Sequence, residues 1–337
     1  MFFLFTIFAL LIQAGDIDPN SLADYPYKLM HLTKNPDGSL TRAKDFYPTN
    51  PPNNSISHAF SRDVTLNKTK KTWIRLYLPN KSNLANLPVI IFGHGGGFII
   101  LSTATPSFDL FLSKTAGKLN VLIVSVEYRL TPENRLPAAY DDFLEALQWV
   151  KKKNDDWVRK YADVSKCIVM GESSGANVAY NAVLRASLMV RELRPLVIRG
   201  LVLVQPFIGG VLRTGSELRK AANTPGLPLV VMDFLWNQSL PLGTNRDHLY
   251  CNPLIRGGSR NLDKIKRLGW PITIMGCNGD ILIDRQLMMF DFLKQQGVNV
   301  IGNFSIGGYH GVFLNETAEI EKLYGFTRSV FPSILPY

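Results

Sequence analysis

The sequence predicts an α/β fold built on a mostly parallel, doubly wound sheet. One observation is a series of short runs rich in valine, isoleucine and leucine, which are typical of strands buried on both faces. The other is that stretches of helical pattern separate these runs, which favours parallel strands joined by crossover helices. The expected strands are 72–78, 88–93, 121–127, 167–170, 198–204, 271–276 and 299–304, and the expected helices are 108–118, 139–152, 174–191, 284–296 and 316–328.

Two stretches depart from this alternation. Residues 18–61 are rich in proline, asparagine, aspartate and serine and predict an irregular segment that lies over the scaffold. Residues 206–255 are interrupted by proline and glycine and predict a mixed helical insertion. Both adjoin loops at the carboxyl edge of the sheet, where ligands bind in this architecture. We therefore expect residues 16–337 to form a single domain in which these two segments make a lid.

Composition excludes several classes of protein. The chain has 337 residues, of which 46% are hydrophobic and 19% charged, as in an ordinary globular protein. No apolar run reaches the roughly 18 residues that span a bilayer, so we expect no stable membrane insertion of the mature domain. The net charge is +10, but the basic clusters are short and scattered, which indicates a solvated surface and no nucleic-acid partner. We expect a monomer or a weak dimer.

The three cysteines, Cys167, Cys251 and Cys277, are far apart and lack the spacing of metal ligands. Two of them lie in runs with the pattern of buried strands. We therefore expect reduced thiols and no bound metal.

The chain begins with a hydrophobic leader, residues 1–15. Residues 2–12 are apolar and are followed by Gln13-Ala14-Gly15, which resembles a poor cleavage site of a signal peptide. No lysine or arginine precedes the apolar stretch, and three cysteines allow at most one disulfide. We therefore favour an artefact of the gene model and a cytoplasmic protein. The alternative is a true signal peptide and a secreted protein.

The motif Gly171-Glu172-Ser173-Ser174-Gly175 lies between an expected strand and an expected helix. This is the context in which a G-x-S-x-G turn presents a nucleophilic serine, because small residues allow the strained turn. Ser173 is therefore the candidate nucleophile.

The sequence His94-Gly95-Gly96-Gly97 directly follows another expected strand. Adjacent glycines let backbone N–H groups face a ligand, as an oxyanion hole requires. We expect the donors to be Gly95 or Gly96, together with Ser174, and we expect His94 to shape the loop. This loop followed by a G-x-S-x-G elbow is the arrangement of lipases and esterases, which predicts ester hydrolysis through an acyl-enzyme.

In this arrangement the acid and then the histidine follow the serine along the chain. Of the five histidines, only His310 follows the last expected strand, in a glycine-rich turn. The acid should follow the preceding strand, where Asp280 and Asp284 are the candidates. We favour Asp280 at the strand end and expect Asp284 to cap or open the next helix.

Five motifs together resemble the plant carboxylesterases of the hormone-sensitive-lipase-like class, an α/β-hydrolase group. The resemblance extends from about Asp16 to the C-terminus. It implies that Ser173, Asp280 and His310 are the nucleophile, acid and base, that Gly95 and Gly96 belong to the oxyanion hole, and that no cofactor is needed. The motifs are His94–Phe98, Tyr128–Asp142, Gly171–Gly175, Gly279–Asp284 and Gly308–His310.

The resemblance leaves two alternatives to hydrolysis open. Some relatives are dehydratases or cyclases acting on plant specialised metabolites, and one is a gibberellin receptor that has lost the catalytic histidine. The presence of His310 here argues against a receptor. The run Tyr128–Asp142 is diagnostic of the class, but we expect a structural role for it, with Arg129 paired to Glu133.

We expect a largely hydrophobic acyl pocket next to the elbow. Its expected residues are Phe98, Ile99, Phe207 and Trp236, which are apolar and lie in or next to the loops at the carboxyl edge. No basic cluster adjoins the elbow to hold a charged acyl group. The predicted substrates are therefore small uncharged esters with short to medium acyl chains.

Overall fold

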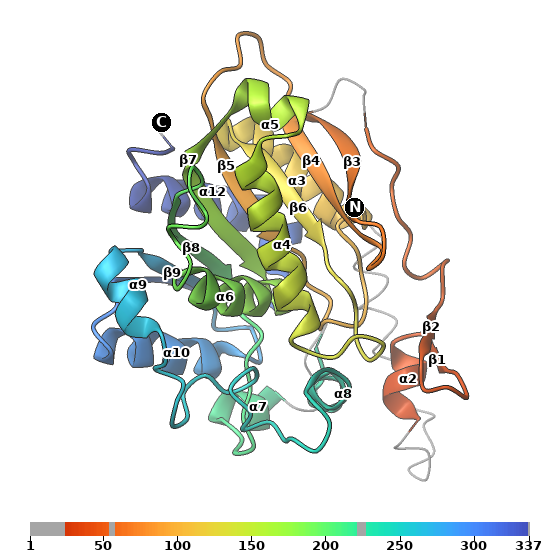
Figure 1. Cartoon of the computed structure of the whole chain (residues 1–337). Helices are drawn as coiled ribbons and strands as arrows, with labels where there is room; N and C mark the ends of the chain where they lie inside the picture. The colour runs from red at the N-terminus through yellow and green to blue at the C-terminus, as the bar shows by residue number, and fades with distance from the viewer. Residues whose placement is uncertain (1–23, 54–57, 221–226, 336–337) are drawn as a thin grey trace.

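The computed structural model describes residues 24–53, 58–220 and 227–335, so the leader 1–15 lies outside the described residues (Figure 1). Its main sheet has eight strands in the order β10-β9-β8-β7-β5-β6-β4-β3. The pairs β3–β4 and β4–β6 are antiparallel and all the other pairs are parallel. The strands are β3 (Ala59–Asn67), β4 (Thr72–Pro79), β5 (Leu87–Gly93), β6 (Leu122–Glu127), β7 (Ala162–Glu172), β8 (Ile198–Val204), β9 (Ile272–Cys277) and β10 (Val300–Ser305).

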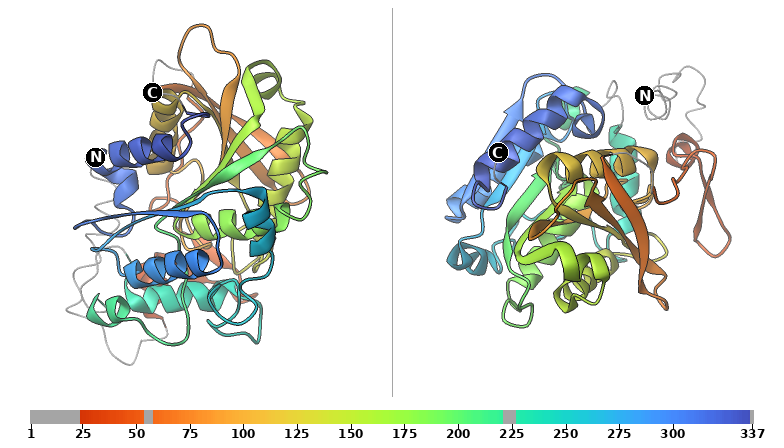
Figure 2. Two further views of the ribbon diagram at one scale, coloured as in Figure 1. Left: turned by 90° about the vertical axis from the view of Figure 1, so that its left-hand side faces the viewer. Right: turned by 90° about the horizontal axis from the view of Figure 1, so that it is seen from above.

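Helices cover both faces of this sheet, as the alternation of the sequence predicts (Figure 2). Residues Ile90 and Phe92 of β5 pack with Phe108 of α3 on one face. Their neighbours Val89 and Ile91 point to the other face, where α4 and α6 lie, because side chains alternate along a strand. The helices around the sheet are α3 (Pro106–Leu119), α4 (Ala138–Lys152), α5 (Asp156–Tyr161), α6 (Ser174–Ala186), α9 (Leu262–Leu268), α10 (Ile283–Gln295), α11 (Val312–Asn315) and α12 (Thr317–Val330).

The structure differs from the sequence prediction at several elements of the scaffold. The short helices α5, α9 and α11 were not predicted, and β7 begins at Ala162 and not at residue 167. The edge strand β3 was not predicted, because only Ala59 and Ser61 of its nine residues are buried and the strand has no continuous apolar run. Helix α6 ends at Ala186 and not at 191. The N–H of Leu188 bonds to the carbonyl of Arg185, three residues earlier, and such a tightened turn ends a helix.

The two stretches outside the alternation contain short elements. The N-terminal stretch is not wholly irregular, because it holds α2 (Tyr25–Leu29), the paired strands β1 (Leu32–Lys34) and β2 (Leu40–Arg42), and the start of β3. The insertion holds α7 (Gly215–Lys220) and α8 (Leu229–Ser239). Tyr27 of α2 meets Phe234 of α8 edge to face, with ring centroids 4.7 Å apart. Within the described residues, no helix is both long and apolar enough to cross a membrane.

Candidate active site

Ser173 occupies a strained turn between β7 and α6. Its backbone has φ 54° and ψ −121°, a region that residues with a side chain rarely adopt. The flanking glycines allow this turn, because a Cβ on Gly175 would come within 2.0 Å of the carbonyl oxygen of Gly93 in β5. A Cβ on Gly171 would lie 2.3 Å from the carbonyl oxygen of Gly175. The motif thus packs α6 directly against the sheet and leaves the Ser173 side chain at its carboxyl edge.

The structure brings Ser173, His310 and Asp280 into one hydrogen-bonded chain. Nε2 of His310 lies 2.8 Å from Oγ of Ser173, and Nδ1 lies 2.9 Å from Oδ2 of Asp280. All three side chains are buried, with exposed fractions of 7% for Ser173, 8% for His310 and 0% for Asp280. They come from three different loops, after β7, β9 and β10, that meet at the same edge of the sheet.

The surroundings of Asp280 keep its carboxylate ionised. Oδ1 accepts a hydrogen bond from the N–H of Leu282 at 2.9 Å, and Oδ2 accepts from the side-chain amides of Gln205 and Gln286, each at 2.8 Å. Burial alone would raise the pKa of Asp280, but the facing imidazole and the donated hydrogen bonds outweigh burial and lower it.

The imidazole of His310 is shifted in the opposite direction. Burial alone would lower the pKa of His310, but the charge of Asp280 and the hydrogen bond to it outweigh burial and raise the pKa above its usual value. When His310 takes up a proton during the reaction, the carboxylate of Asp280 stabilises the charged imidazole. The pair is therefore arranged to favour a protonated imidazole.

Gln205 joins the acid to the histidine loop, a role that the sequence analysis did not predict. Its amide Nε2 donates to Asp280 and to the carbonyl of Tyr309 at 3.0 Å, and its Oε1 accepts from the N–H of Gly311 at 2.8 Å. Gln205 thus bonds to the residues on both sides of His310. Gln286 also contacts Asp280, but its Oε1 has no hydrogen-bond partner among the described residues. The only signal for Gln205 in the sequence was that a polar residue directly follows the buried strand β8.

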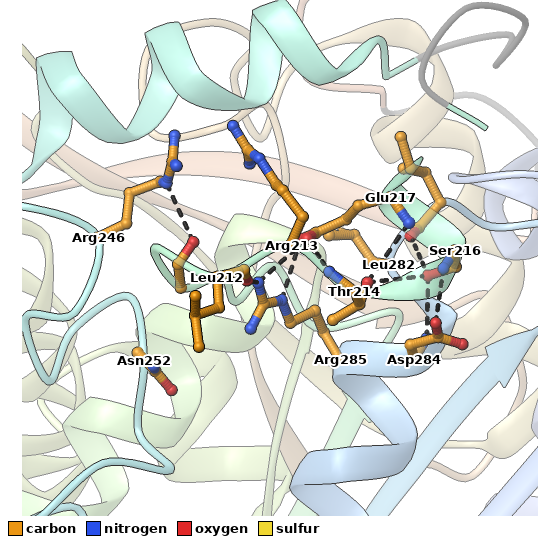
Figure 3. A network of polar contacts seen from close by, with 12 residues as sticks. Leu212, Arg213, Thr214, Ser216, Glu217, Arg246, Asn252, Leu282, Asp284 and Arg285 are labelled. Carbon is orange, nitrogen blue, oxygen red and sulfur yellow. Dashed lines mark hydrogen bonds and ion pairs between the residues drawn. The ribbon is translucent and has the colours of Figure 1, made fainter. Parts of the chain in front are cut away.

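Asp284 opens the next helix, as predicted, and its carboxylate also contacts a second helix. It lies in the first turn of α10, yet its Oδ2 accepts from the N–H of Ser216 in α7 at 2.6 Å. Next to it, Arg285 and Glu217 form a buried ion pair with Nε 3.0 Å from Oε1 (Figure 3). Since α7 belongs to the insertion, this network ties the insertion to the helix that follows the Asp280 loop. Asp284 is not hydrogen-bonded to His310, whose Nδ1 contacts Asp280.

The glycine loop follows β5 and lies beside Ser173. Gly96 has φ 109° and Gly97 has φ 60°, and a Cβ on Gly96 would lie 2.0 Å from the carbonyl oxygen of Ile100. Gly96 and Gly97 line the cavity described below, whereas Gly95 packs behind it. In the described part of the chain, the backbone N–H groups of Gly95, Gly96 and Ser174 donate no hydrogen bond to the protein. Gly97, which was not predicted, adds a candidate donor.

His94 lies below this loop and not in the cavity. Its ring is fully buried and stacks on Tyr128 with centroids 4.3 Å apart, and its Nδ1 lies 2.8 Å from the carbonyl oxygen of Gly95. Burial lowers the pKa of His94 to about 4. The ring is therefore neutral near pH 7.

A cavity of about 960 Å³, counting the part open to solvent, lies at Ser173 and His310. Its walls come from the N-terminal stretch, the glycine loop, α3, α8 and α11. Most of the lining is apolar. Examples are Met30 from the N-terminal stretch, Val231 and Leu235 from α8, and Leu314 from α11.

Of the four predicted pocket residues, only Phe207 lines this cavity. Phe98, Ile99 and Trp236 do not line the cavity, contrary to the prediction, and lie in the hydrophobic core. The rings of Phe98 and Trp236 pack against Phe207 at 6.0 and 4.7 Å and so support the wall from behind. The sequence shows which residues are apolar but not which of them faces the open space.

Glu172, the residue before Ser173, is a second functional candidate that the sequence analysis did not single out. It lines the cavity and is 4% exposed. Its Oε2 lies 2.2 Å from the position that a Cβ on Gly95 would take. Burial raises the pKa of Glu172 to about 7. Among the described residues, it has no hydrogen-bond partner for its carboxyl group.

The run Tyr128–Asp142 supports the site from below, but through ion pairs other than the one predicted. Arg129 pairs with Asp142, with Nη2 2.9 Å from Oδ1, and Glu133 pairs with Arg42 of β2 at 3.1 Å. Glu133 also accepts from the N–H of Leu40 at 2.9 Å. The run therefore holds the N-terminal stretch against the scaffold. Arg42, the partner of Glu133, is too distant in sequence for this pair to be inferred from spacing.

Comparison with known proteins gives a consistent result. Residues 90–314 match a family described by the alpha/beta hydrolase fold. Carboxylesterase 20 of Arabidopsis thaliana is 41% identical over 327 residues, which cover 94% of this chain and 99% of that protein. A 3-O-acetylpapaveroxine carboxylesterase of Papaver somniferum is 40% identical over 301 residues, covering 85% of this chain and 91% of that protein.

Solved structures show the same fold. A thermophilic carboxylesterase cloned from a metagenomic library superposes with a TM-score of 0.67 at 25% identity, covering 82% of this chain and 90% of that one. An esterase of the fungus Rhizomucor miehei superposes with a TM-score of 0.71 at 20% identity, covering 97% and 95%. The chain therefore belongs to the α/β-hydrolase family and, within it, to the plant carboxylesterases of the hormone-sensitive-lipase-like class.

Proposed function

We propose that this carboxylic ester hydrolase cleaves uncharged esters with short to medium acyl chains through an acyl-enzyme on Ser173. The observation that carries the proposal is the hydrogen-bonded chain of Ser173, His310 and Asp280 at the floor of an apolar cavity. The short distances in this chain match those needed for proton transfer from a nucleophile to its base.

In the proposed reaction, Nε2 of His310 takes the proton of Ser173 as Oγ attacks the ester carbonyl carbon. Asp280 holds the imidazole tautomer and stabilises the imidazolium. The carbonyl oxygen becomes an oxyanion that accepts hydrogen bonds from Gly95 or Gly96 and from Ser174. His310 then gives its proton to the leaving alcohol, and a water molecule releases the acid by the reverse sequence.

The segments that cover the cavity support the proposed length of the acyl chain. We propose that the N-terminal stretch and the insertion form a lid, because residues of both line the cavity. Their helices are short, with 5 residues in α2, 6 in α7 and 11 in α8, unlike a long amphipathic helix that docks on lipid. The name of the Papaver relative, 3-O-acetylpapaveroxine carboxylesterase, identifies an acetyl ester as its substrate, in accord with a short acyl group.

Measuring kcat/KM over 4-nitrophenyl esters from about two to about sixteen carbons tests this proposal. We expect a maximum at short to medium chains and a sharp fall with long chains. Activity that rises steadily to the longest chain, or that is activated at an emulsified lipid surface, would contradict the proposal. A hydroxyisoflavanone-type substrate in the same panel tests for elimination chemistry.

A further inference from the structure

A buried carboxyl group in the cavity is not used by the proposed reaction. Glu172 is more than nine-tenths buried and lines the cavity, its carboxyl group makes no hydrogen bond among the described residues, and its oxygens are open to the cavity space. A carboxyl group that faces a mostly apolar cavity loses its contact with water when a ligand fills that cavity, so a well-matched ligand must supply a polar partner for it. The hydroxyl of Ser107, another residue of the cavity lining, also has no partner in the part of the chain described.

Other buried or half-buried carboxyls in the part of the chain that the structure describes do have hydrogen-bond partners. Glu127 has a side chain that is 17% exposed, and burial raises its pKa to about 7, but its Oε2 accepts from the hydroxyl of Ser102 at 2.9 Å and the N–H of Thr103 at 2.8 Å. Asp280 accepts hydrogen bonds from His310, Gln205 and other donors. Glu172 differs from these carboxyls in that its carboxyl group faces the cavity and has no partner from the described residues.

The place of Glu172 limits where the ligand group can be. A Cβ built on Gly95 would lie 2.2 Å from Oε2 of Glu172 and 3.2 Å from Cβ of Ser173, so the carboxyl lies close to the nucleophile. During reaction the ester carbonyl carbon lies at Oγ of Ser173. A group bound by Glu172 is therefore attached to the substrate within a few bonds of that carbon, on the acyl or the alcohol side.

Resting on the proposed esterase function, we infer that the natural substrate carries a hydroxyl group within a few bonds of its ester carbonyl carbon, on the acyl or the alcohol side, and that Glu172 binds this hydroxyl. A hydroxyl can accept from a protonated carboxyl and donate to an ionised one, so it pairs with Glu172 in either state. An ammonium group can donate to the ionised carboxylate, but it cannot accept a hydrogen bond from the protonated carboxyl. Hence the neutral donor is favoured.

Matched esters measured with matched variants test this inference. Ethyl 2-hydroxypropanoate is compared with ethyl 2-methylpropanoate, and 2-hydroxyethyl acetate with propyl acetate, so that a methyl group replaces the hydroxyl in each pair. The ratio of kcat/KM for the two esters of a pair is measured by pH-stat titration in the wild type and in Glu172→Met. This ratio is then compared between the wild type and Glu172→Met. The comparison cancels the intrinsic reactivity of each ester and any effect of Glu172 on His310 that is the same for both esters.

We expect the hydroxyl-to-methyl ratio of at least one pair to fall about tenfold or more in Glu172→Met and to recover in part in Glu172→Gln. Glu172→Ala replaces Glu172→Met if the latter does not fold. Glu127→Gln is the matched control, because it changes a half-buried carboxyl of raised pKa that is already paired, and its ratios should equal those of the wild type.

Ratios in both pairs that are the same with and without the Glu172 carboxyl would overturn the inference. So would a dependence on Glu172 that appears only with ethyl 2-aminopropanoate, because that result would indicate a site for a cation. Failure of the wild type to hydrolyse any of these esters would instead contradict the proposed function, so the two failures are distinguishable.

Discussion

The carboxyl edge of the sheet and the lid walls beside it are held together by different interactions. At the edge, His310, Asp280 and Gln205 are linked by hydrogen bonds of 2.8 to 3.0 Å. Ion pairs such as that between Arg42 and Glu133 anchor the walls to the scaffold, but the walls meet each other through apolar contacts such as that between Tyr27 and Phe234. Hydrogen bonds fix the direction of a group, whereas apolar packing tolerates changes of similar volume. Changes at the edge should therefore affect the turnover of every ester, and changes in the walls should alter which ester is preferred.

The largest effect at the edge is expected from Ser173→Ala. Removing Oγ eliminates the proposed nucleophile and should lower kcat for all esters by about 10³-fold or more. The substitution leaves no large cavity, so the circular dichroism spectrum should not change. Retention of more than about a tenth of wild-type turnover would show that the reaction does not proceed through this serine.

The two aspartates after β9 should differ sharply. Asp280→Asn should reduce kcat by about 10²- to 10⁴-fold, because the imidazole loses its charged partner. Activity requires neutral His310 and falls as the pH drops through its pKa. Since Asp280 raises that pKa, the acid limb of kcat/KM should move to lower pH in Asp280→Asn. A limb that stays in place or moves to higher pH would contradict the assigned pair.

Asp284→Asn is the matched control for that substitution. Asp284 accepts a hydrogen bond from Ser216 and makes none with His310. The variant should therefore lose about 1 kcal/mol of unfolding free energy in urea denaturation and keep its turnover within severalfold. If Asp284→Asn were the more damaging of the two, the choice of carboxylate would be wrong.

The two glutamines around Asp280 should give an intermediate effect. Gln205→Leu breaks the hydrogen bonds to Asp280, Tyr309 and Gly311, and we expect kcat/KM to fall about 10- to 100-fold. Gln286→Leu breaks only the bond to Asp280 and should cost about threefold. Both variants remove a donor from Asp280, so both acid limbs should move slightly to higher pH. Equal losses in turnover would show that the contacts of Gln205 with the histidine loop do not position His310.

The smallest effect on turnover, but the clearest on selectivity, is expected in the wall. Val231→Ala enlarges the cavity from α8 and should raise the preference for longer over shorter acyl chains about tenfold. Leu242→Ala removes side-chain volume from an 81% exposed residue of the insertion and is the control. The 4-nitrophenyl ester series measures both variants. A similar shift in both, or a uniform loss over all chain lengths with Val231→Ala, would argue against this cavity as the acyl site.

The difference between edge and walls also explains what the sequence could predict. Strands buried on both faces leave a continuous apolar signal, and Ser173, His310 and their glycines follow such strands at fixed positions, so their meeting place could be inferred. The roles of Gln205 and Glu172 depend on contacts made only in three dimensions. Phe98 and Trp236 are as apolar as Phe207, and their sequence pattern does not show which side of a wall each one occupies.

The most direct test of the central claim is to identify the residue that forms the covalent intermediate. The protein is treated with diethyl 4-nitrophenyl phosphate, digested and examined by mass spectrometry, with Ser173→Ala treated in parallel. We predict one diethyl phosphoryl group on the peptide containing Ser173, loss of esterase activity in proportion to labelling, and no label in the variant. Complete inactivation with the label on another residue, or full esterase activity after treatment of an enzyme that remains unlabelled, would contradict a Ser173 acyl-enzyme.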